Sequence, residues 1–382
     1  MIGPLWWPAL VVSGGALLTW FRAPLGILWR PAVGAIEWGH WWGLLCVGLA
    51  LASPTEASRL LCVLAALLFL SPWCRAETWW SREHRRPLDR WSAWRLRPAR
   101  PRPVPRSIHY RRGPAELLDL YVPTGRASGD LDLQETAPPV ALIVHGGSWR
   151  GGDRGQLRHF SEALANAGII VASMDYRLAP VHPFPAAVDD VLAAIQWLQS
   201  AESPVADAAS HLVLLGRSAG GHLALLAAYG APPGQVRGVV SLYGPTDLEW
   251  SWNHPTPRRI YDSRRSLRDF LGATLPENPN LYREASPLNR ATAASPPTLL
   301  LHGGRDELIS ARQGERLAER LDALGVAHEF RVLPWASHGF EVNPVSASGQ
   351  ITLQLTLDFI QRVTGRGPSG SPPAISRGRG SS

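Results

Sequence analysis

The chain of 382 residues contains no lysine, only two methionines and only three cysteines. All of its basic residues are therefore arginines, which we interpret as a compositional bias rather than as chemistry. Cys46, Cys62 and Cys74 all lie in the first 75 residues, and an odd number confined to one apolar region excludes a disulfide framework. No C-x-x-C pair is present to predict a metal site. We interpret the cysteines as small apolar side chains.

Charge is distributed unevenly along the chain. Residues 75–112 contain twelve arginines against three acidic residues, whereas residues 113–364 contain twenty arginines against twenty-six acidic residues. The formal net charge of +7 is thus the sum of a basic segment and a mildly acidic domain that follows it. Such a segment suits nucleic acid or anionic lipid. Because it follows a strongly apolar region, we expect membrane lipid as the partner and no nucleic acid.

Three uncharged runs dominate the N-terminal region, at 4–21, 38–54 and 60–74. A helix needs about 20 apolar residues to cross a bilayer, and tryptophans near the ends of these runs fit an interfacial belt. Residues 1–75 are therefore predicted to form a membrane anchor of two or three transmembrane helices. A secretory signal peptide fits poorly, because no basic residue precedes Arg22. A soluble, tryptophan-rich helical cap is the alternative.

The segments that flank the central domain are polar. Residues 76–112 are predicted to be a basic linker rich in proline and arginine. The positive-inside rule predicts an integral membrane protein whose C-terminal domain lies in the cytoplasm. Residues 365–382 consist largely of glycine, serine, proline and arginine and are predicted to be a disordered tail. The number of spans and the oligomeric state stay open.

Strand and helix patterns alternate between 113 and 364. Apolar strands that alternate with amphipathic helices predict an α/β fold, with a mostly parallel sheet covered by helices on both faces. Sites in such sheets lie beyond the carboxyl ends of the strands. Strands are predicted at 140–147, 168–176, 211–216, 236–244, 297–304 and 328–335, and helices at 185–200, 221–230, 311–326 and 351–363.

A G-x-S-x-G motif at 216–220 separates a predicted strand from a predicted helix. This context indicates a catalytic serine, because a sharp turn between a strand and a helix leaves the serine exposed and needs small residues on either side. Ser218 is therefore the predicted nucleophile. A passive serine in a glycine-rich turn is the alternative.

A serine needs a base, and the base needs an acid that orients it. In this fold the chain order is serine, acid, histidine. Asp306 follows a predicted strand and is preferred to Glu307 because its side chain is shorter. His338 follows the next strand and is the predicted base. His302 and His222 are weaker candidates, since one lies on a strand and the other on a helix.

The developing oxyanion also needs donors. The segment "HGGSWRGG" (145–152) follows a predicted strand, and its glycines allow main-chain N–H groups to approach a substrate. Gly146 and Gly147, together with Ala219, are predicted to form the oxyanion hole. His145 is expected to brace this loop.

These motifs, with "DYRLAPVHPFPAAVDD" (175–190), "YGPTDL" (243–248), "LHGGRDEL" (301–308) and "SHGFE" (337–341), resemble the α/β-hydrolase superfamily. Within it, the chain is similar to the hormone-sensitive-lipase-like and BD-FAE-like esterases over about 115–364. The resemblance implies an α/β-hydrolase fold and a serine hydrolase that acts on small carboxylic esters without a metal or cofactor. It implies a substrate pocket at His145, Trp149, Arg217, Tyr243 and Phe340.

Two departures concern the substrate. The lipase-like esterases usually carry an acidic residue where this chain has Arg217, and the loop reads His-Gly-Gly-Ser-Trp instead of His-Gly-Gly-Gly. Both favour the BD-FAE-like group. A segment at about 250–288 interrupts the alternation and is predicted to be a lid.

A membrane anchor favours a lipophilic ester as the substrate. Three other functions stay open: an amidase or formamidase, a peptidase-like hydrolase, and an inactive membrane scaffold.

Overall fold

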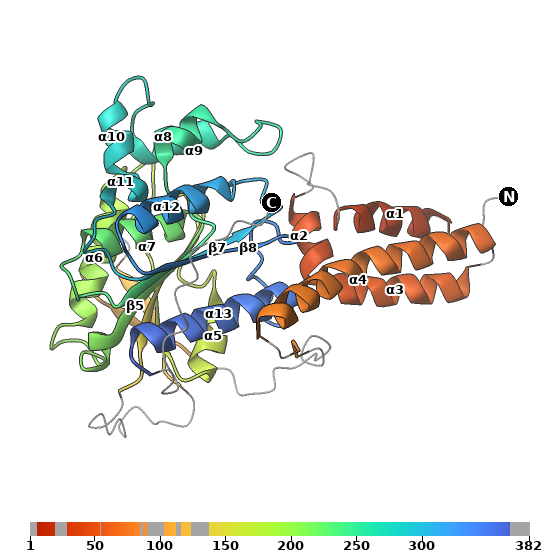
Figure 1. Cartoon of the computed structure of the whole chain (residues 1–382), viewed down its shortest axis with the longest axis horizontal. Helices are drawn as coiled ribbons and strands as arrows, with labels where there is room; N and C mark the ends of the chain where they lie inside the picture. The colour runs from red at the N-terminus through yellow and green to blue at the C-terminus, as the bar shows by residue number, and fades with distance from the viewer. Residues whose placement is uncertain are drawn as a thin grey trace.

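The computed structural model describes residues 6–19, 29–53, 55–84, 87–89, 103–111, 116–123 and 137–366. These residues form an α/β domain and a group of N-terminal helices that extends away from it (Figure 1). The predicted disordered tail lies almost wholly outside the described residues, as do residues 85–86, 90–102 and 112 of the predicted linker.

An eight-stranded sheet forms the centre of the described α/β domain, in the order β1-β2-β4-β3-β5-β6-β7-β8. Strand β2 pairs antiparallel with both β1 and β4, and all the other pairings are parallel. The strands are β1 (Arg106–His109), β2 (Leu117–Tyr121), β3 (Val140–Val144), β4 (Ile170–Met174), β5 (Leu212–Arg217), β6 (Gly238–Leu242), β7 (Thr298–Gly303) and β8 (His328–Leu333).

Helices cover both faces of the sheet, which confirms the predicted layers. Side chains alternate along each strand, so the sheet contributes to two separate apolar cores. One face packs against α6 (Ala186–Leu198), α7 (Ala219–Gly230) and α12 (Arg312–Ala323), and the other against α5 (Arg158–Asn166) and α13 (Ala347–Val363).

The predicted lid consists of short helices beside the carboxyl ends of the strands (Figure 1). They are α8 (Leu248–Asn253), α9 (Ser263–Leu271), α10 (Pro279–Glu284) and α11 (Pro287–Arg290).

The N-terminal helices differ from the prediction. They are α1 (Trp6–Leu17), α2 (Trp29–Glu37), α3 (Gly39–Ala52) and α4 (Glu56–His84). The first two apolar runs form helices too short to cross a bilayer, whereas the third lies within α4. Over the part of the chain that is described, the helical stretch Glu56–Arg82 alone is long and apolar enough for a span.

The predicted linker boundaries also change. Helix α4 continues to His84, and β1 pairs with β2 before residue 113. Strands β1 and β2 were both missed. The four residues of β1 are mostly polar and show no clear alternation, and the five residues of β2 include Asp119 in an apolar run.

Candidate active site

Ser218 lies between β5 and α7, on a backbone with φ 51° and ψ −123°. This conformation is unusual for a residue with a side chain and indicates a strained turn. The turn also requires its glycines. A Cβ atom at Gly216 would lie 2.1 Å from the carbonyl oxygen of Gly220, and one at Gly220 would lie 2.1 Å from that of Val144.

Asp306 and His338 follow β7 and β8, so all three side chains lie at the same edge of the sheet. The Nε2 atom of His338 lies 3.1 Å from Oγ of Ser218. Its Nδ1 atom lies 2.7 Å from Oδ2 of Asp306. Residues separated by 120 and 32 positions in the chain thus form one hydrogen-bonded series.

Main-chain groups orient Asp306. Its Oδ1 atom accepts hydrogen bonds from the N–H groups of Leu308 and Ile309, at 2.9 and 2.8 Å. Glu307, the competing candidate, lines the adjacent cavity. His302 lies on β7, where burial lowers its pKa to about 4 and keeps its ring neutral.

Gly146, Gly147 and Ala219 line the cavity next to Ser218. The N–H of Gly146 donates to Oε1 of Gln156 at 2.8 Å, so this donor is already used in a hydrogen bond to a side chain. The donors that we retain for an oxyanion are therefore those of Gly147 and Ala219. At Gly147 φ is 127°, and a Cβ atom there would lie 2.0 Å from the carbonyl oxygen of Gly151.

A cavity of about 960 Å³ opens at Ser218 and extends under the lid. This is near the upper end of the range for small-molecule sites. Over the described residues, its wall includes Trp149 and Arg217 but not His145, Tyr243 or Phe340.

Those three side chains lie behind the wall, a correction to the expected pocket. His145 stacks on Tyr176, with ring centroids 4.1 Å apart, and so braces the glycine loop. Tyr243 and Phe340 are fully buried, and the Tyr243 ring lies 4.3 Å from that of His338. They were misplaced because a motif gives the position of a residue but not the direction of its side chain.

Arg217 forms an ion pair with Glu341, in which Nε lies 3.0 Å from Oε1. The guanidinium group also lies 5.8 Å from the centre of the Tyr243 ring. Glu341 is fully buried, so this pair fixes the segment that carries His338 against the segment that carries Ser218.

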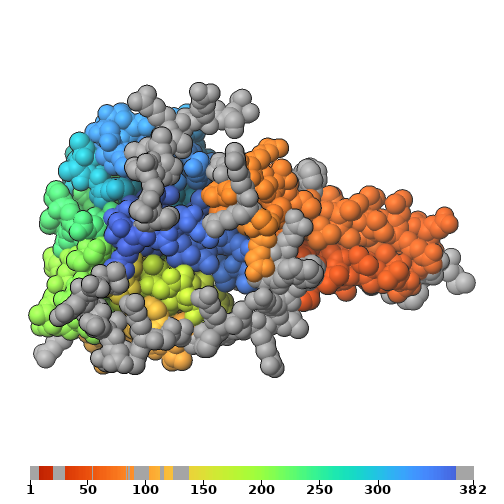
Figure 2. All heavy atoms as spheres, turned by 60° about the horizontal axis from the view of Figure 1, so that its bottom comes forward, coloured from red at the N-terminus to blue at the C-terminus, as the bar shows by residue number. Residues whose placement is uncertain are grey.

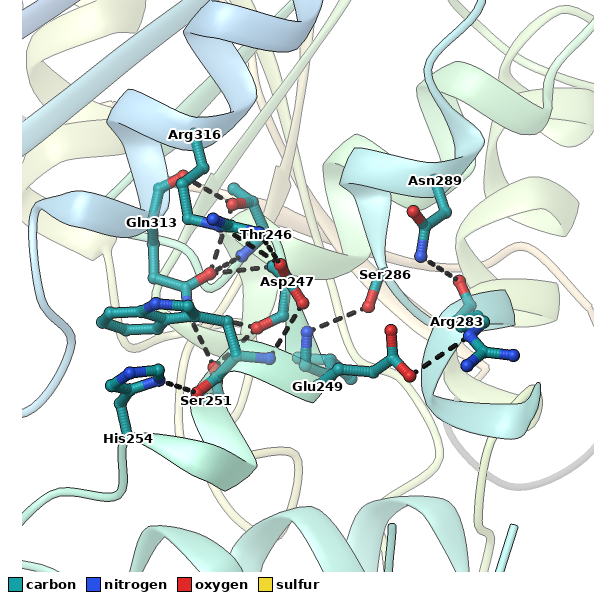
Figure 3. A network of polar contacts seen from close by, with 12 residues as sticks. Thr246, Asp247, Glu249, Ser251, His254, Arg283, Ser286, Asn289, Gln313 and Arg316 are labelled. Atoms are coloured by element: carbon teal, nitrogen blue, oxygen red, sulfur yellow. Dashed lines mark hydrogen bonds and ion pairs between the residues drawn. The ribbon is translucent and has the colours of Figure 1, made fainter. Parts of the chain in front are cut away.

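The lid is attached to α12 by a polar network (Figure 3). Oε1 of Gln313 accepts the N–H groups of Thr246 and Asp247, at 2.7 and 2.8 Å, and Nε2 donates to Oγ of Ser251 at 2.8 Å. Arg316 forms an ion pair with Asp247 at 2.7 Å. Gln313 and Ser251 also line the cavity, so the network fixes one of its walls.

Several cavity residues were not found from the sequence. Gln156 lies in a loop with no motif of its own, and Gln313 lies at the start of an ordinary amphipathic helix. The sequence signal for the lid was the interruption of the strand–helix alternation, which does not identify contacts. The additional side chains in the wall include Gln156, Trp250, His254, Ile260, Leu267 and Gln313.

A strained serine after β5, an acid after β7 and a histidine after β8, on a mostly parallel sheet, define an α/β-hydrolase fold. The family model for BD-FAE matches residues 118–321, which is more than half of the chain. The chain therefore belongs to the BD-FAE family.

Similar proteins agree with this assignment. Esterase LipC of Mycobacterium tuberculosis is 32% identical over 272 residues, which cover 68% of this chain and 65% of LipC. Carboxylesterase NlhH of the same organism is 30% identical, with 60% of this chain and 72% of NlhH covered. The chain spans less than two thirds of LipC and of the related LipM and LipQ.

Solved structures share the fold. Esterase 2 of Thermogutta terrifontis, phosphonylated by sarin, is 24% identical with a TM-score of 0.57, and the match covers 72% of this chain and all of that one. A truncated carbohydrate esterase from gut microbiota is 21% identical with a TM-score of 0.56, and the match covers 68% of this chain and 95% of that one.

Proposed function

We propose that this chain is a membrane-anchored serine hydrolase that cleaves carboxylic esters. The observation that carries the proposal is the hydrogen-bonded series Ser218–His338–Asp306, which opens into a cavity. The named esterases among its relatives support the ester as the bond that is cleaved.

In the proposed mechanism, Oγ of Ser218 attacks the ester carbonyl carbon while Nε2 of His338 takes its proton. The carbonyl oxygen becomes an oxyanion, which the N–H groups of Gly147 and Ala219 stabilise. Collapse of this intermediate breaks the bond to the alcohol, which leaves with the proton from His338. Water then attacks the acyl group on Ser218 with His338 again as the base, and the free acid is released. Asp306 keeps the imidazole oriented and stabilises its charged form.

The proposed substrate is a small ester with a substantial apolar group. The cavity volume of about 960 Å³ accommodates more than a short acyl chain. Apolar side chains from the lid and from the loop after β7 line it, namely Trp250, Ile260, Leu267, Leu308 and Ile309.

The proposed anchor rests on the N-terminal helices. Their exposed side chains include Val11, Trp41, Leu45, Leu51 and Leu67, a surface that suits lipid rather than water. With the basic residues at 75–112 on the cytoplasmic side, the α/β domain lies in the cytoplasm. Protease treatment of sealed, right-side-out vesicles should therefore spare the α/β domain, and digestion there would reject this orientation.

The chemistry is tested by labelling the full chain with a fluorophosphonate and locating the adduct by mass spectrometry. We expect one adduct at Ser218 and turnover of p-nitrophenyl butyrate. S218A should lose the adduct and at least about 10³-fold of the turnover. The control S210A removes an exposed serine away from the site and should match the native chain. An adduct elsewhere, or full turnover by S218A, would reject the mechanism.

A further inference from the structure

The base of the N-terminal helices contacts both loops that carry the acid and the histidine of the proposed triad. From this geometry we infer that the N-terminal helices position Asp306 and His338 through Arg305 and Glu37, and so act as part of the machinery for turnover. This inference rests on the proposed function and adds to the anchor a second role.

The first contact is made by Arg305, the residue before Asp306. Its guanidinium group donates to the main-chain carbonyl oxygens of Leu18 and Thr19, in the turn that directly follows α1. These carbonyls have no partner within the helix and carry partial negative charge, so a buried arginine suits them. Arg305 is only 8% exposed. A buried guanidinium group needs such partners, and here the N-terminal helices supply them.

Arg305 also connects the two loops to each other. Its N–H donates to the carbonyl oxygen of Ala336 at 2.9 Å, two residues before His338. A shift of Arg305 therefore moves the acid directly and the histidine through one main-chain hydrogen bond.

The second contact is made by Glu37, the last residue of α2. Its carboxyl group accepts a hydrogen bond from Oγ of Ser346, and its main-chain carbonyl accepts one from Nδ2 of Asn343 at 3.1 Å. Both partners lie on the segment that follows His338. Burial raises the pKa of Glu37 to about 8, so the group is neutral at pH 7 and an uncharged amide can replace it.

Apolar packing continues the same interface. The rings of Trp79, on α4, and Trp335 meet edge to face with centroids 6.0 Å apart. Ile36, Ala76 and Trp80 belong to the same buried cluster as Phe340. Figure 2 shows the last turns of α4 lying against α13. The segment that carries His338 is thus enclosed between the sheet and the N-terminal helices.

The test compares R305A, R305K, E37A and E37Q with the native full chain in one detergent. Arg237 provides the control, since its Nε atom also donates to a main-chain carbonyl, that of Ser210 at 3.0 Å, at the opposite edge of the sheet. Titration with a fluorophosphonate counts the chains whose Ser218 is reactive. Each rate is divided by this count, so that unfolded chains do not affect the comparison.

We expect R305A to lower kcat for p-nitrophenyl butyrate by at least about tenfold with little change in KM, because small displacements of reacting groups are costly. The acidic limb of the kcat/KM profile against pH should also shift, because it reports the histidine that Asp306 orients. R305K keeps one donor and should recover part of the rate. E37A should show a smaller loss, which E37Q should largely restore because it keeps an acceptor for Ser346.

The inference is overturned if R305A and E37A both have the kcat and pH profile of R237A. If R305A does not fold, the comparison of E37A with E37Q tests the inference, and equal rates for these two variants would overturn the inference. A native chain that neither takes the label at Ser218 nor turns over the ester would reject the proposed function instead.

Discussion

The N-terminal helices and the α/β domain are both rich in apolar residues, but they sort them by size in opposite ways. In the α/β domain the large side chains are inside, and every residue of β3 is fully buried. Where α1, α3 and α4 pack together the buried side chains are small except for Phe69, whereas Leu51 is 82% exposed and Leu67 is 61% exposed. The buried small residues there include Ala9, Ala16, Cys46, Ala50, Cys62, Ala65 and Ala66.

This difference indicates the solvent to which each region is adapted. In water, burial of large apolar side chains drives folding. In lipid that drive is absent between helices, and small residues at the interface let the backbones approach closely. Gly39 and Gly43 lie one turn apart on the side of α3 that faces α4, which is the small-xxx-small pattern of membrane helices.

The junction of the two regions combines large buried apolar side chains, such as Trp80 and Trp335, with buried polar contacts. Arg305, Glu37 and Asn343 each connect the helices with a loop next to the triad. The comparison supports the proposed lipid environment of the N-terminal helices and the positioning role that we infer for the junction.

The strongest test of the comparison substitutes a leucine in each region. Leu142→Ala in β3 should lower the free energy of unfolding of the α/β domain by about 3 kcal/mol, because it leaves a cavity in a packed core. Leu67→Ala in α4 should lower the free energy of unfolding by less than about 0.5 kcal/mol. Urea unfolding in detergent, followed by loss of ester turnover, measures both. An equal cost at the two positions would show that Leu67 packs against protein and not lipid.

The second test substitutes two glycines of α3. A Cβ atom at Gly39 would lie 2.3 Å from the main-chain oxygen of Phe69, whereas one at Gly48 would meet nothing within 4 Å. Gly39→Leu should therefore destabilise the packing of α3 against α4 by about 1–3 kcal/mol, and Gly48→Leu should not. Far-UV circular dichroism during titration with sodium dodecyl sulfate measures the helices directly. Equal midpoints for the two variants would contradict the proposed helix interface.

Much of the α/β domain could be predicted, because its strands are short apolar runs between turn signals and its helices have a 3.6-residue period. Helix α5 and strands β1 and β2 were missed. Helix α5 and strand β1 are short and carry many polar side chains, whereas β2 is a five-residue strand whose apolar run is interrupted by Asp119. In the N-terminal region the apolar runs were found, but their helix lengths were not. Glu56 and the residues after Cys74 continue α4 beyond its uncharged part, so a window that stops at charges underestimates that helix.

The candidate site divides in the same way. The convergence of Ser218, Asp306 and His338 was predictable because each follows a strand of the parallel sheet, and the known chain order of such sites suggests their roles. The hydrogen bond from Gly146 to Gln156 was not predictable, because it joins the glycine motif to a loop that has no motif of its own. The contacts of Arg305 and Glu37 connect positions 287 and 306 residues apart, and no local pattern encodes such a pair.

The last prediction concerns pH and has the smallest expected effect. Burial lowers the pKa of His222 and of His302 to about 4. His222 is also held neutral by its partners, since Nδ1 accepts from Trp149 at 3.1 Å and Nε2 donates to the carbonyl of Ala285 at 2.7 Å. Below about pH 6.5 both histidines bind a proton in the unfolded chain but stay neutral in the folded chain. The free energy of unfolding therefore falls as the pH falls towards 4.

Glu37 acts in the opposite sense on the alkaline side. Its pKa is raised to about 8, so between pH 4.5 and 8 the folded chain holds a proton that the unfolded chain releases, and stability falls as pH rises. The sum predicts a maximum near pH 6.5, with limbs of about 1.4 kcal/mol per pH unit for each net proton. Urea midpoints between pH 4.5 and 8 measure the curve. E37Q should flatten the limb above pH 6.5 and steepen the acidic limb, because it removes the opposing contribution that Glu37 makes between pH 4.5 and 6.5. An alkaline limb that persists in E37Q would show that another group causes it.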